Sequence, residues 1–306
     1  MLFEEFKDCF IERLYDEFGE NSDIRVTDVI KNNGIKLTGV TVIFKGVQAC
    51  PSIYIEHFYD DYNNGDSFED IMSSVFEILR NCRLEEELDL SIFDSYNSIK
   101  DKILCKLVNT EKNKELLASA PHINFLDLSV VFYVIMTSVK HGMGSILIKD
   151  NIFSDWQVSV DQMFKDAKEN NKRLLGSKIE PIEEVLRRMV KGCDQESDLI
   201  SDLDDLNMRN GKSYMYVLTN SQLTNGAASL LDNEALCDFS NAINSDFYII
   251  PSSIHELILV PVKNDLEDST LKSMVKEINA KEVSPQEVLS DNIYFFSRSL
   301  NKVVGV

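Results

Sequence analysis

Two serines, a histidine and a glutamate lie close together in the stretch YIIPSSIHELILVP, residues 248–261. A serine nucleophile requires a base within hydrogen-bond distance and a third group that orients the base. Alternate residues of a strand share a face, so Ser253 and His255 could touch, whereas Glu256 would point to the opposite face. Ser253, His255 and Glu256 are therefore candidate catalytic residues of a hydrolase whose orienting acid comes from elsewhere in the chain.

The same stretch also has a purely structural interpretation. The apolar residues 249–250 and 257–260 are typical of buried strands, and Pro251-Ser252-Ser253 would form the turn between them. Serine hydroxyls in such turns bind backbone groups, and His255 could complete that network. The sequence contains no GxSxG elbow, no GxxxxGK[ST] loop and no GxGxxG motif. It therefore favours the turn over the catalytic site and predicts no cofactor.

The sequence predicts no metal site either. His255-Glu256 begins like the zinc motif HExxH, but Leu259 occupies the position of the second histidine. The six cysteines form no CxxC pair, which is typical of reduced thiols in a protein core. Ser252, Asn220 and Asn225 are candidates for lining a polar binding pocket, although asparagine also favours such positions as a turn former.

The charge balance limits the classes of partner. The 306 residues include 31 Lys and Arg but 51 Asp and Glu, a net charge of −20. Such a surface repels nucleic-acid phosphates and anionic lipids, so we expect neither nucleic-acid nor membrane binding. The acidity serves either solubility or a protein partner with a basic surface. The N-terminus does not resemble a secretory signal, and the most apolar run, 125–136, is too short to span a bilayer. A cytoplasmic location is expected.

The first 100 residues are predicted to form a helix and a β-hairpin. Phe6, Phe10, Leu14 and Phe18 recur every four residues and so share one face of a helix, which Gly19 would end. Asn32-Asn33-Gly34 separates two apolar stretches, and Asn-Gly favours the left-handed backbone of a tight turn. A hairpin over 24–44 is therefore expected.

The remaining chain is expected to form two α/β units, 101–192 and 213–306. Strands are predicted at 103–110, 126–136, 145–149, 214–221, 246–250, 256–262 and 292–299, and helices near 111–119, at 227–243 and ending about 278. Ser154 and Gln157 form a capping-box pattern that predicts the start of another helix.

The two units have related element orders. The pairs LVNT/VLTN and ILIK/ILVP recur about 110 residues apart. The predicted fold is therefore α+β, with two β-α-β-β-α, ferredoxin-like units that arose by internal duplication, unless the order recurs by chance. Residues 193–212 between the units carry six acids and no base over 194–205 and are expected to form an acidic linker.

Several stretches resemble a family of uncharacterised proteins from Clostridia and related gut Firmicutes, a domain of unknown function. They are PSIYIEHFYDDY (51–62), CKLVNTEKNKELLASAPHINFLDLSVVFYV (105–134), YVLTNSQLTNGAASLL (216–231), IIPSSIHELILVP (249–261) and EVLSDNIYFFSR (287–298). The resemblance covers most of the chain and implies a bacterial, phage or mobile-element protein. It implies no activity and no catalytic residues.

These observations favour a non-enzymatic cytoplasmic protein that binds or regulates other proteins. Two alternatives stay open. One is a hydrolase that uses Ser253 and His255. The other is an acidic inhibitor of a nucleic-acid enzyme, of the kind that phages and mobile elements direct against host defences, which would require the acids to gather on one face.

Overall fold

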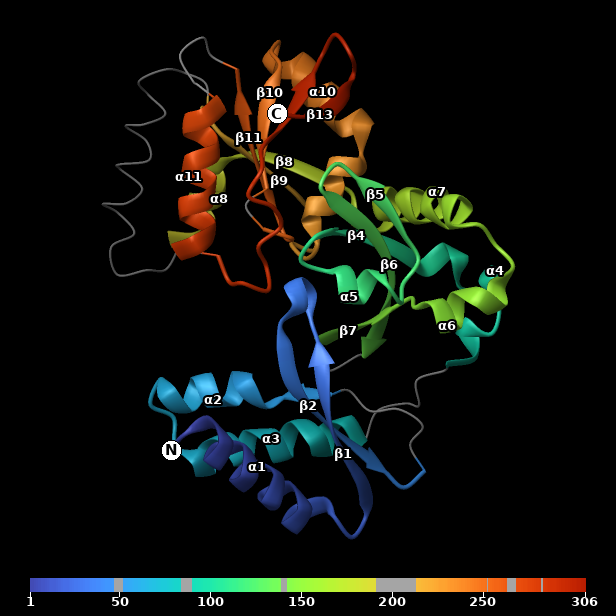
Figure 1. Cartoon of the computed structure of the whole chain (residues 1–306), viewed down its shortest axis with the longest axis vertical. Coiled ribbons are helices and arrows are strands. Elements are labelled where there is room, and N and C mark those ends of the chain that lie inside the picture. Colours follow the sequence, from blue (N-terminus) through green and yellow to red (C-terminus); the bar gives the residue numbers. More distant parts are fainter. Residues whose placement is uncertain are drawn as a thin grey trace.

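The computed structural model describes residues 1–46, 52–83, 90–138, 142–190, 213–251, 253–262, 268–281 and 283–306. Helices and strands are mixed in an α+β fold, as the sequence predicts. Three sheets follow one another along the chain, and Figure 1 shows the first and the last at opposite ends of an elongated molecule. Within the described ranges, no helix combines the length and apolar character needed to cross a membrane.

The N-terminal unit packs three helices against a three-stranded sheet. Its elements are α1 (Phe3–Phe18), β1 (Ser22–Ile30), β2 (Lys36–Phe44), β3 (Ile53–Tyr54), α2 (Ile55–Asn63) and α3 (Phe68–Arg83). The predicted first helix is confirmed, because Phe6, Phe10, Leu14 and Phe18 are all buried and pack in one core with residues of β2 and α3. The four-residue spacing thus identified the buried face correctly.

The predicted hairpin is confirmed as well. Strands β1 and β2 pair antiparallel from Ser22 with Phe44 to Ile30 with Lys36. The tip is a short 3-10 turn, Asn32–Gly34, in which Asn33 and Gly34 have φ angles of 60° and 71°. In Figure 1 the hairpin projects from its helices toward the middle of the molecule.

The middle sheet is organised around one long strand. Its strands are β4 (Ile103–Asn109), β5 (His122–Phe125), β6 (Leu128–Ser138) and β7 (Gly142–Leu147), and its helices are α4 (Tyr96–Ile99), α5 (Lys114–Leu117), α6 (Asp150–Phe153) and α7 (Val160–Asn170). Strand β6 pairs with β4 along one edge and with β5 and β7 along the other. One face, including Cys105 and Phe132, shares a core with Met163 and Ala167 of α7.

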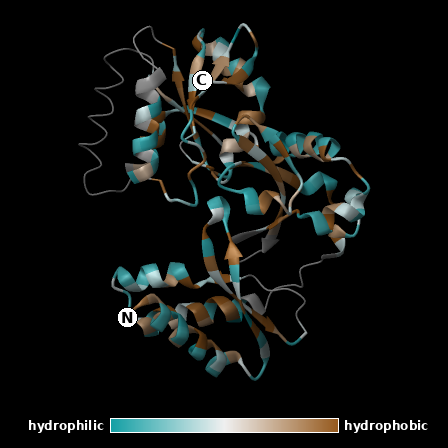
Figure 2. Ribbon diagram, viewed as in Figure 1, coloured by the Kyte–Doolittle hydropathy of each residue, from teal (hydrophilic) through white to brown (hydrophobic). Residues whose placement is uncertain are grey.

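The C-terminal sheet has six antiparallel strands in the order β13-β12-β10-β11-β9-β8. They are β8 (Ser177–Pro181), β9 (Tyr216–Asn220), β10 (Phe247–Ile250), β11 (Leu257–Pro261), β12 (Tyr294–Ser297) and β13 (Lys302–Gly305), accompanied by α8 (Ile182–Val190), α10 (Asn233–Ile243) and α11 (Asp268–Lys281). Apolar residues of this sheet and of the middle sheet belong to one continuous core. Accordingly, Figure 2 shows many of the strands brown along much of their length.

The strand orders do not confirm two ferredoxin-like units. In a ferredoxin-like sheet, the fourth strand lies beside the first. Here β12, the fourth strand counted from β9, pairs with β10, and β8 lies beside β9 in its place. The middle sheet has a different strand order, so the two sheets also give no support to a duplication. Local periodicity predicts where strands occur in the sequence, but it does not predict their order in a sheet.

The helix start predicted at Ser154 and Gln157 is wrong. Residues Ser154–Trp156 form a 3-10 turn, and Gln157 has a left-handed backbone with a φ angle of 50°. Helix α7 begins five residues later, where the Ser159 hydroxyl accepts a hydrogen bond from the backbone N–H of Gln162 at 3.1 Å. The same Ser-x-x-Gln pattern therefore occurs twice, and only the second copy caps a helix. The expected acidic linker, 193–212, lies outside the described residues.

A short segment between α11 and β12, residues 285–290, connects all three sheets; we call it the central segment. Each of its six consecutive carbonyls accepts a hydrogen bond. The Asn33 side chain donates to the carbonyls of Pro285 and Val288, and the Asn32 side chain donates to that of Gln286. The backbone N–H of Ile254 donates to the Glu287 carbonyl, and the side chains of Asn109 and Asn279 donate to those of Leu289 and Ser290. The six donor–acceptor distances are 2.6–3.1 Å. Asn33 is itself joined to Asn113 by two reciprocal bonds. The hairpin tip, the middle sheet and the C-terminal unit therefore meet on this segment.

A carboxylate strengthens the same junction. Asp127, in the turn between β5 and β6, accepts hydrogen bonds from Ser290, Asn292 and the Tyr294 hydroxyl at 2.6–3.0 Å. Burial alone would raise the pKa of Asp127, but these hydrogen bonds outweigh it and lower the pKa. The ionised carboxylate thus holds the middle sheet to the strand that follows the central segment.

Candidate functional site

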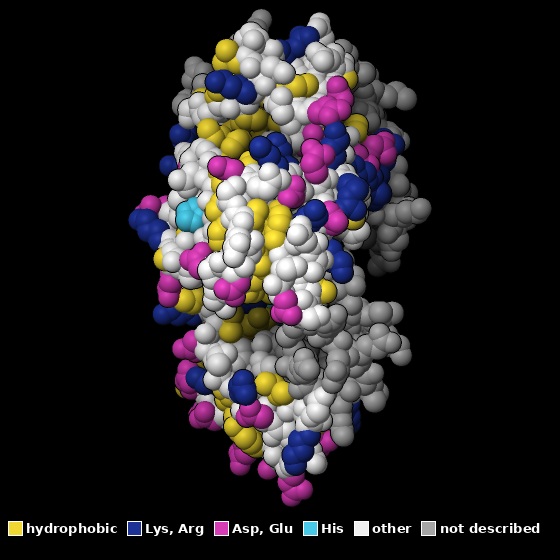
Figure 3. Space-filling model, turned by 90° about the vertical axis from the view of Figure 1, so that its right-hand side faces the viewer, with side chains coloured by type: hydrophobic (Ala, Val, Ile, Leu, Met, Phe, Trp, Pro, Cys, Tyr) yellow, Lys and Arg dark blue, Asp and Glu magenta, His cyan; other side chains and the backbone are white. Residues whose placement is uncertain are grey.

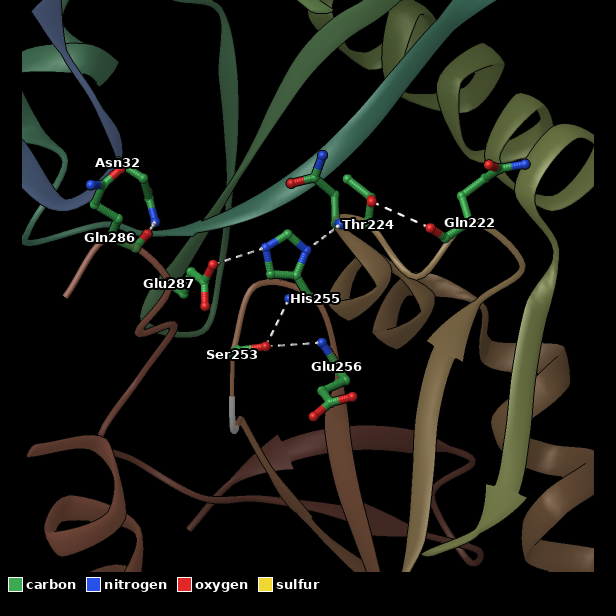
Figure 4. Close-up of polar contacts among 9 residues, drawn as sticks. Asn32, Gln222, Thr224, Ser253, His255, Glu256, Gln286 and Glu287 are labelled. Atoms are coloured by element: carbon green, nitrogen blue, oxygen red, sulfur yellow. Dashed lines mark hydrogen bonds and ion pairs between the residues drawn. The ribbon is translucent and has the colours of Figure 1, made fainter. Parts of the chain in front are cut away.

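The residues that could do chemistry lie in the turn between β10 and β11. The buried Ser253 hydroxyl accepts hydrogen bonds from the backbone N–H groups of His255 and Glu256, at 3.0 and 3.3 Å, as Figure 4 shows. The backbone N–H of Ser253 donates to the Glu256 carbonyl at 3.1 Å. The hydroxyl therefore closes the turn, in the way serine does in many tight turns.

His255 points away from that hydroxyl. Its Nδ1 accepts a hydrogen bond from the backbone N–H of Asn225 at 3.2 Å, and its Nε2 lies 3.6 Å from Oε1 of Glu287. Because Nδ1 accepts, the neutral imidazole carries its proton on Nε2, facing the Glu287 carboxylate. The ring thus joins the β9 loop to the central segment, and no hydrogen bond connects it to Ser253. Glu256 extends to the other side, as the sequence predicts.

A glycine makes the close packing of this turn possible. The His255 carbonyl accepts a hydrogen bond from the Thr219 hydroxyl at 2.8 Å. A Cβ atom on Gly226 would lie 2.2 Å from that hydroxyl oxygen and 2.3 Å from the carbonyl oxygen. The adjacent backbone N–H of Ala227 donates to the Ile254 carbonyl at 3.2 Å. Only a residue without a side chain fits here, so Gly226 fixes the distance between β9 and the turn.

The loop after β9, residues 221–225, is organised by Asn220. The side chain of Asn220 donates to the Thr224 carbonyl at 2.8 Å and accepts from the N–H groups of Gln222 and Thr224, at 3.0 and 3.4 Å. Between them, Leu223 has a left-handed φ of 54° and is 62% exposed. The loop is therefore held rigidly while its most apolar side chain faces solvent.

Of the other two binding candidates, Asn225 has hydrogen-bond partners within the fold, and Ser252 lies outside the described residues. Asn225 has a left-handed φ of 52°, and its side chain bonds the Tyr133 hydroxyl of β6. Burial raises the pKa of Tyr133 to about 12 despite this bond, so the phenol stays protonated. Ser252 is outside the described residues. The structure thus brings Asn220, Asn225, Ser253 and His255 together around the β9 loop.

One residue of this cluster escaped the sequence reasoning. Glu287 is the acid nearest the imidazole, yet it lies 32 positions along the chain in a stretch without a motif. A general base must offer a free nitrogen to the proton that it removes, and a serine nucleophile must contact that base. Here Nδ1 of His255 already accepts a hydrogen bond from the backbone N–H of Asn225. The Ser253 hydroxyl already accepts hydrogen bonds from two backbone N–H groups and none from the imidazole. The arrangement is well suited to holding the turn, the β9 loop and the central segment together.

A pocket of about 200 Å³ lies at the seam between the middle and C-terminal sheets, beside Asn220. Its lining includes Cys105, and burial raises the pKa of this thiol to about 12. Several of its polar side chains already have partners: the Asn171 amide bonds the backbone of Cys105, Ser177 bonds Asp232, and Lys172 pairs with Glu234. In the part of the chain that the structure covers, no three His, Cys, Asp or Glu side chains are placed to hold a metal ion.

The charge pattern can be followed on one face of the molecule. Figure 3 shows acidic and basic side chains interspersed over the face turned to the viewer, with apolar patches between them. That face does not have the continuous acidic surface that an inhibitor of a nucleic-acid enzyme would require.

Comparison with known proteins gives a family but no activity. The model of a family of unknown function, DUF5688, matches residues 3–298. The chain belongs to this family. The match runs from α1 through β12 and so includes the first two sheets, the C-terminal sheet without its edge strand β13, the central segment and the turn that holds Ser253 and His255. Searches of curated proteins and of solved structures gave no match.

Proposed function

We propose that this protein is a non-enzymatic cytoplasmic binding or regulatory protein that contacts another protein through the loop 221–225. The observation that supports this proposal is Leu223, which is 62% exposed in a left-handed backbone conformation. The loop lies next to the turn of Ser253 and His255, because Asn225 binds the imidazole.

Leu223 has an unfavourable backbone conformation and leaves most of its side chain unburied. A left-handed conformation is unfavourable by about 1–2 kcal/mol for a residue with a Cβ atom, and Gly or Asn tolerates it better. Because its side chain is 62% exposed, Leu223 also lacks most of the roughly 1.5–3 kcal/mol that full burial of a leucine would give. Backbone strain of this kind is concentrated at functional sites. A partner that buried Leu223 would recover the second term, and the rigid loop would lose little entropy on binding.

Catalysis at the adjacent turn has less support. The Ser253 hydroxyl and Nδ1 of His255 each bind backbone N–H groups, and the nearest carboxylate, that of Glu287, faces Nε2 at 3.6 Å. A binding role leaves all these hydrogen bonds intact, whereas the hydrolase alternative requires the turn to rearrange before the serine can react.

The test compares tagged wild-type protein with Leu223→Asn in affinity capture from the native host, followed by mass spectrometry. We expect the wild type to capture a stoichiometric partner, and Leu223→Asn to lose it while its melting temperature stays equal or rises. Leu300→Asn is the matched control, because Leu300 is 59% exposed without left-handed backbone strain. Capture at low and high salt reports whether the partner has a basic surface. If Leu223→Asn captures the same partner as Leu300→Asn, the loop is not the contact and the proposal is wrong.

A further inference from the structure

A cavity of about 610 Å³ lies where the hairpin tip, the middle sheet and the C-terminal unit meet on the central segment. Its lining includes Asn33 of the hairpin tip, Lys112 in the turn after β4 and Lys281 at the end of α11. Val288 of the central segment also lines it, and the Val288 carbonyl accepts a hydrogen bond from Asn33 at 2.7 Å. All three units of the chain therefore contribute side chains to this cavity.

The charges of the lining favour an anion. Lys112 and Lys281 line the cavity, and no Asp or Glu is among the described residues that do so, although the chain has 51 acids for 31 bases. Lys112 is exposed and forms no salt bridge within the described ranges. Lys281 pairs with Glu277 at 2.6 Å, but these side chains are 64% and 66% exposed, so water screens the pair. The two ammonium groups can therefore still attract a carboxylate.

A buried acceptor in the same lining lacks a donor. Asn279 is 6% exposed, and its Nδ2 donates to the Ser290 carbonyl at 2.8 Å and to Oδ1 of Asp291 at 3.0 Å. These two acceptors fix the orientation of the amide, because the reverse orientation would bring oxygen against oxygen. Oδ1 of Asn279 is buried and has no donor among the described residues. Since an unpaired buried acceptor is unfavourable, an N–H group that entered the cavity would stabilise it.

Most of the remaining lining is apolar. Apart from Ser284, it consists of Ile35, Ala280, Val283, Pro285 and Val288. The Ser284 carbonyl already accepts hydrogen bonds from the N–H groups of Glu287 and Val288, at 2.7 and 3.2 Å. This part of the wall therefore offers apolar contact, and the polar contacts come from the lysines and Asn279.

We propose that this cavity binds the C-terminal residue of a peptide. Such a residue carries a carboxylate, a backbone N–H and a side chain within a few bonds of one another. The carboxylate lies against the ammonium groups of Lys112 and Lys281, and the N–H donates to Oδ1 of Asn279. An apolar side chain packs against Ile35 and Val288. Capture of a C-terminal carboxylate is a recurring mode of peptide recognition. A single carboxylate also suits a chain of net charge −20 better than a multiply charged phosphate, because the long-range repulsion is smaller.

This site does not involve Leu223 or the loop 221–225, so it can exist whether or not the contact proposed above does. The test titrates the full-length protein with the tripeptide acetyl-Ala-Ala-Val in isothermal titration calorimetry. Two matched peptides each remove one recognised group. The C-terminal amide lacks the charge, and a methyl group on the nitrogen of the last residue removes the N–H.

We expect the tripeptide to bind with a dissociation constant of about 0.1–1 mM and its amide to bind at least about ten-fold more weakly. The N-methyl peptide should bind about five-fold more weakly, because Oδ1 of Asn279 then stays unpaired. Lys112→Met should weaken binding by about five-fold, and Lys281→Met by less, because Glu277 already pairs with Lys281. Lys102→Met, which changes an exposed lysine outside the cavity, controls for net charge and should bind like the wild type.

Four results would overturn the proposal. The wild type could bind the tripeptide no more tightly than its amide, or fail to bind it at millimolar concentrations. Lys112→Met could bind it as tightly as Lys102→Met does. The N-methyl peptide could bind as tightly as the parent, and Asn279 would then not be the acceptor. Finally, Leu223→Asn could lose the tripeptide, which would place the peptide on the loop 221–225 instead. Because two comparisons change only the peptide, they hold whether or not a variant folds.

Discussion

Gly226→Ala is the substitution that most directly tests the structure of the turn around His255. The added Cβ would lie 2.2 Å from the Thr219 hydroxyl oxygen, 2.3 Å from the His255 carbonyl oxygen and 2.9 Å from the backbone nitrogen of Asn220. Two of these atoms belong to rigid backbone, so β9 and the turn must move apart. The bonds from Thr219 to His255 and from Ala227 to Ile254 would then lengthen or break.

The cost follows from these contacts. Two lost hydrogen bonds contribute about 1 kcal/mol each, and overpacking a tightly packed site adds about 1–3 kcal/mol, so the total is about 3–5 kcal/mol. With an unfolding entropy of about 2.1 cal/mol/K per residue, a chain of 306 residues should lose about 5–8 °C in melting temperature. Calorimetry or thermal circular dichroism measures this shift.

Gly305→Ala is the matched control, because nothing lies within 4 Å of the Cβ that it would add. We expect its melting temperature to stay within about 1 °C of the wild type. If Gly226→Ala melts at the same temperature as Gly305→Ala, the close approach of Thr219 and His255 does not exist in solution, and the account of this turn is wrong.

Other substitutions and probes test separate parts of the fold. Asn33→Ala removes three side-chain hydrogen bonds at the hairpin tip and should destabilise the protein by about 3 kcal/mol, seen as a lower urea midpoint; an unchanged midpoint would contradict the role of the central segment. Because the pKa of Asp127 is lowered in the folded state, its carboxylate stabilises the fold above about pH 4 and this contribution is lost as the pH falls. Asp127→Asn should therefore be less stable than wild type at pH 7, and the difference should shrink below about pH 4. Burial raises the pKa of Cys105 to about 12, so peptide mass spectrometry should find Cys105 unmodified by iodoacetamide at pH 8 in the native protein while the exposed Cys9 reacts.

The local elements were predictable because their signals lie within a few residues. The spacing of Phe6, Phe10 and Leu14 predicts a buried helix face, and Asn33-Gly34 predicts the hairpin tip, since both patterns act through the neighbouring backbone. The capping pattern at Ser154 failed because its short-range signal is not unique: the copy at Ser159 caps the helix instead.

The junction could not be predicted, because its contacts join residues that are far apart in sequence. Asn109 binds a carbonyl 180 residues away, and Asn33 binds one 255 residues away. The sequence around an asparagine in a turn does not indicate whether its side chain binds a distant carbonyl or only helps to form the turn. For the same reason, the sequence could pair Ser253 with His255 on one face but could not reveal that backbone N–H groups occupy both, or that Glu287 lies beside the imidazole.

The central segment has a consequence for how the chain folds during its synthesis. The asparagines of the hairpin tip are made early, but the carbonyl of Val288 that Asn33 binds follows 255 residues later. At about 5–20 residues per second, a ribosome needs roughly 13–50 s to add that stretch. The N-terminal helices and their sheet share a core of their own and can form during this interval. During this interval the hairpin tip lacks its hydrogen-bond partners in the central segment and is exposed to solvent. The three sheets can be joined through that segment only when residues 285–290 emerge from the ribosome.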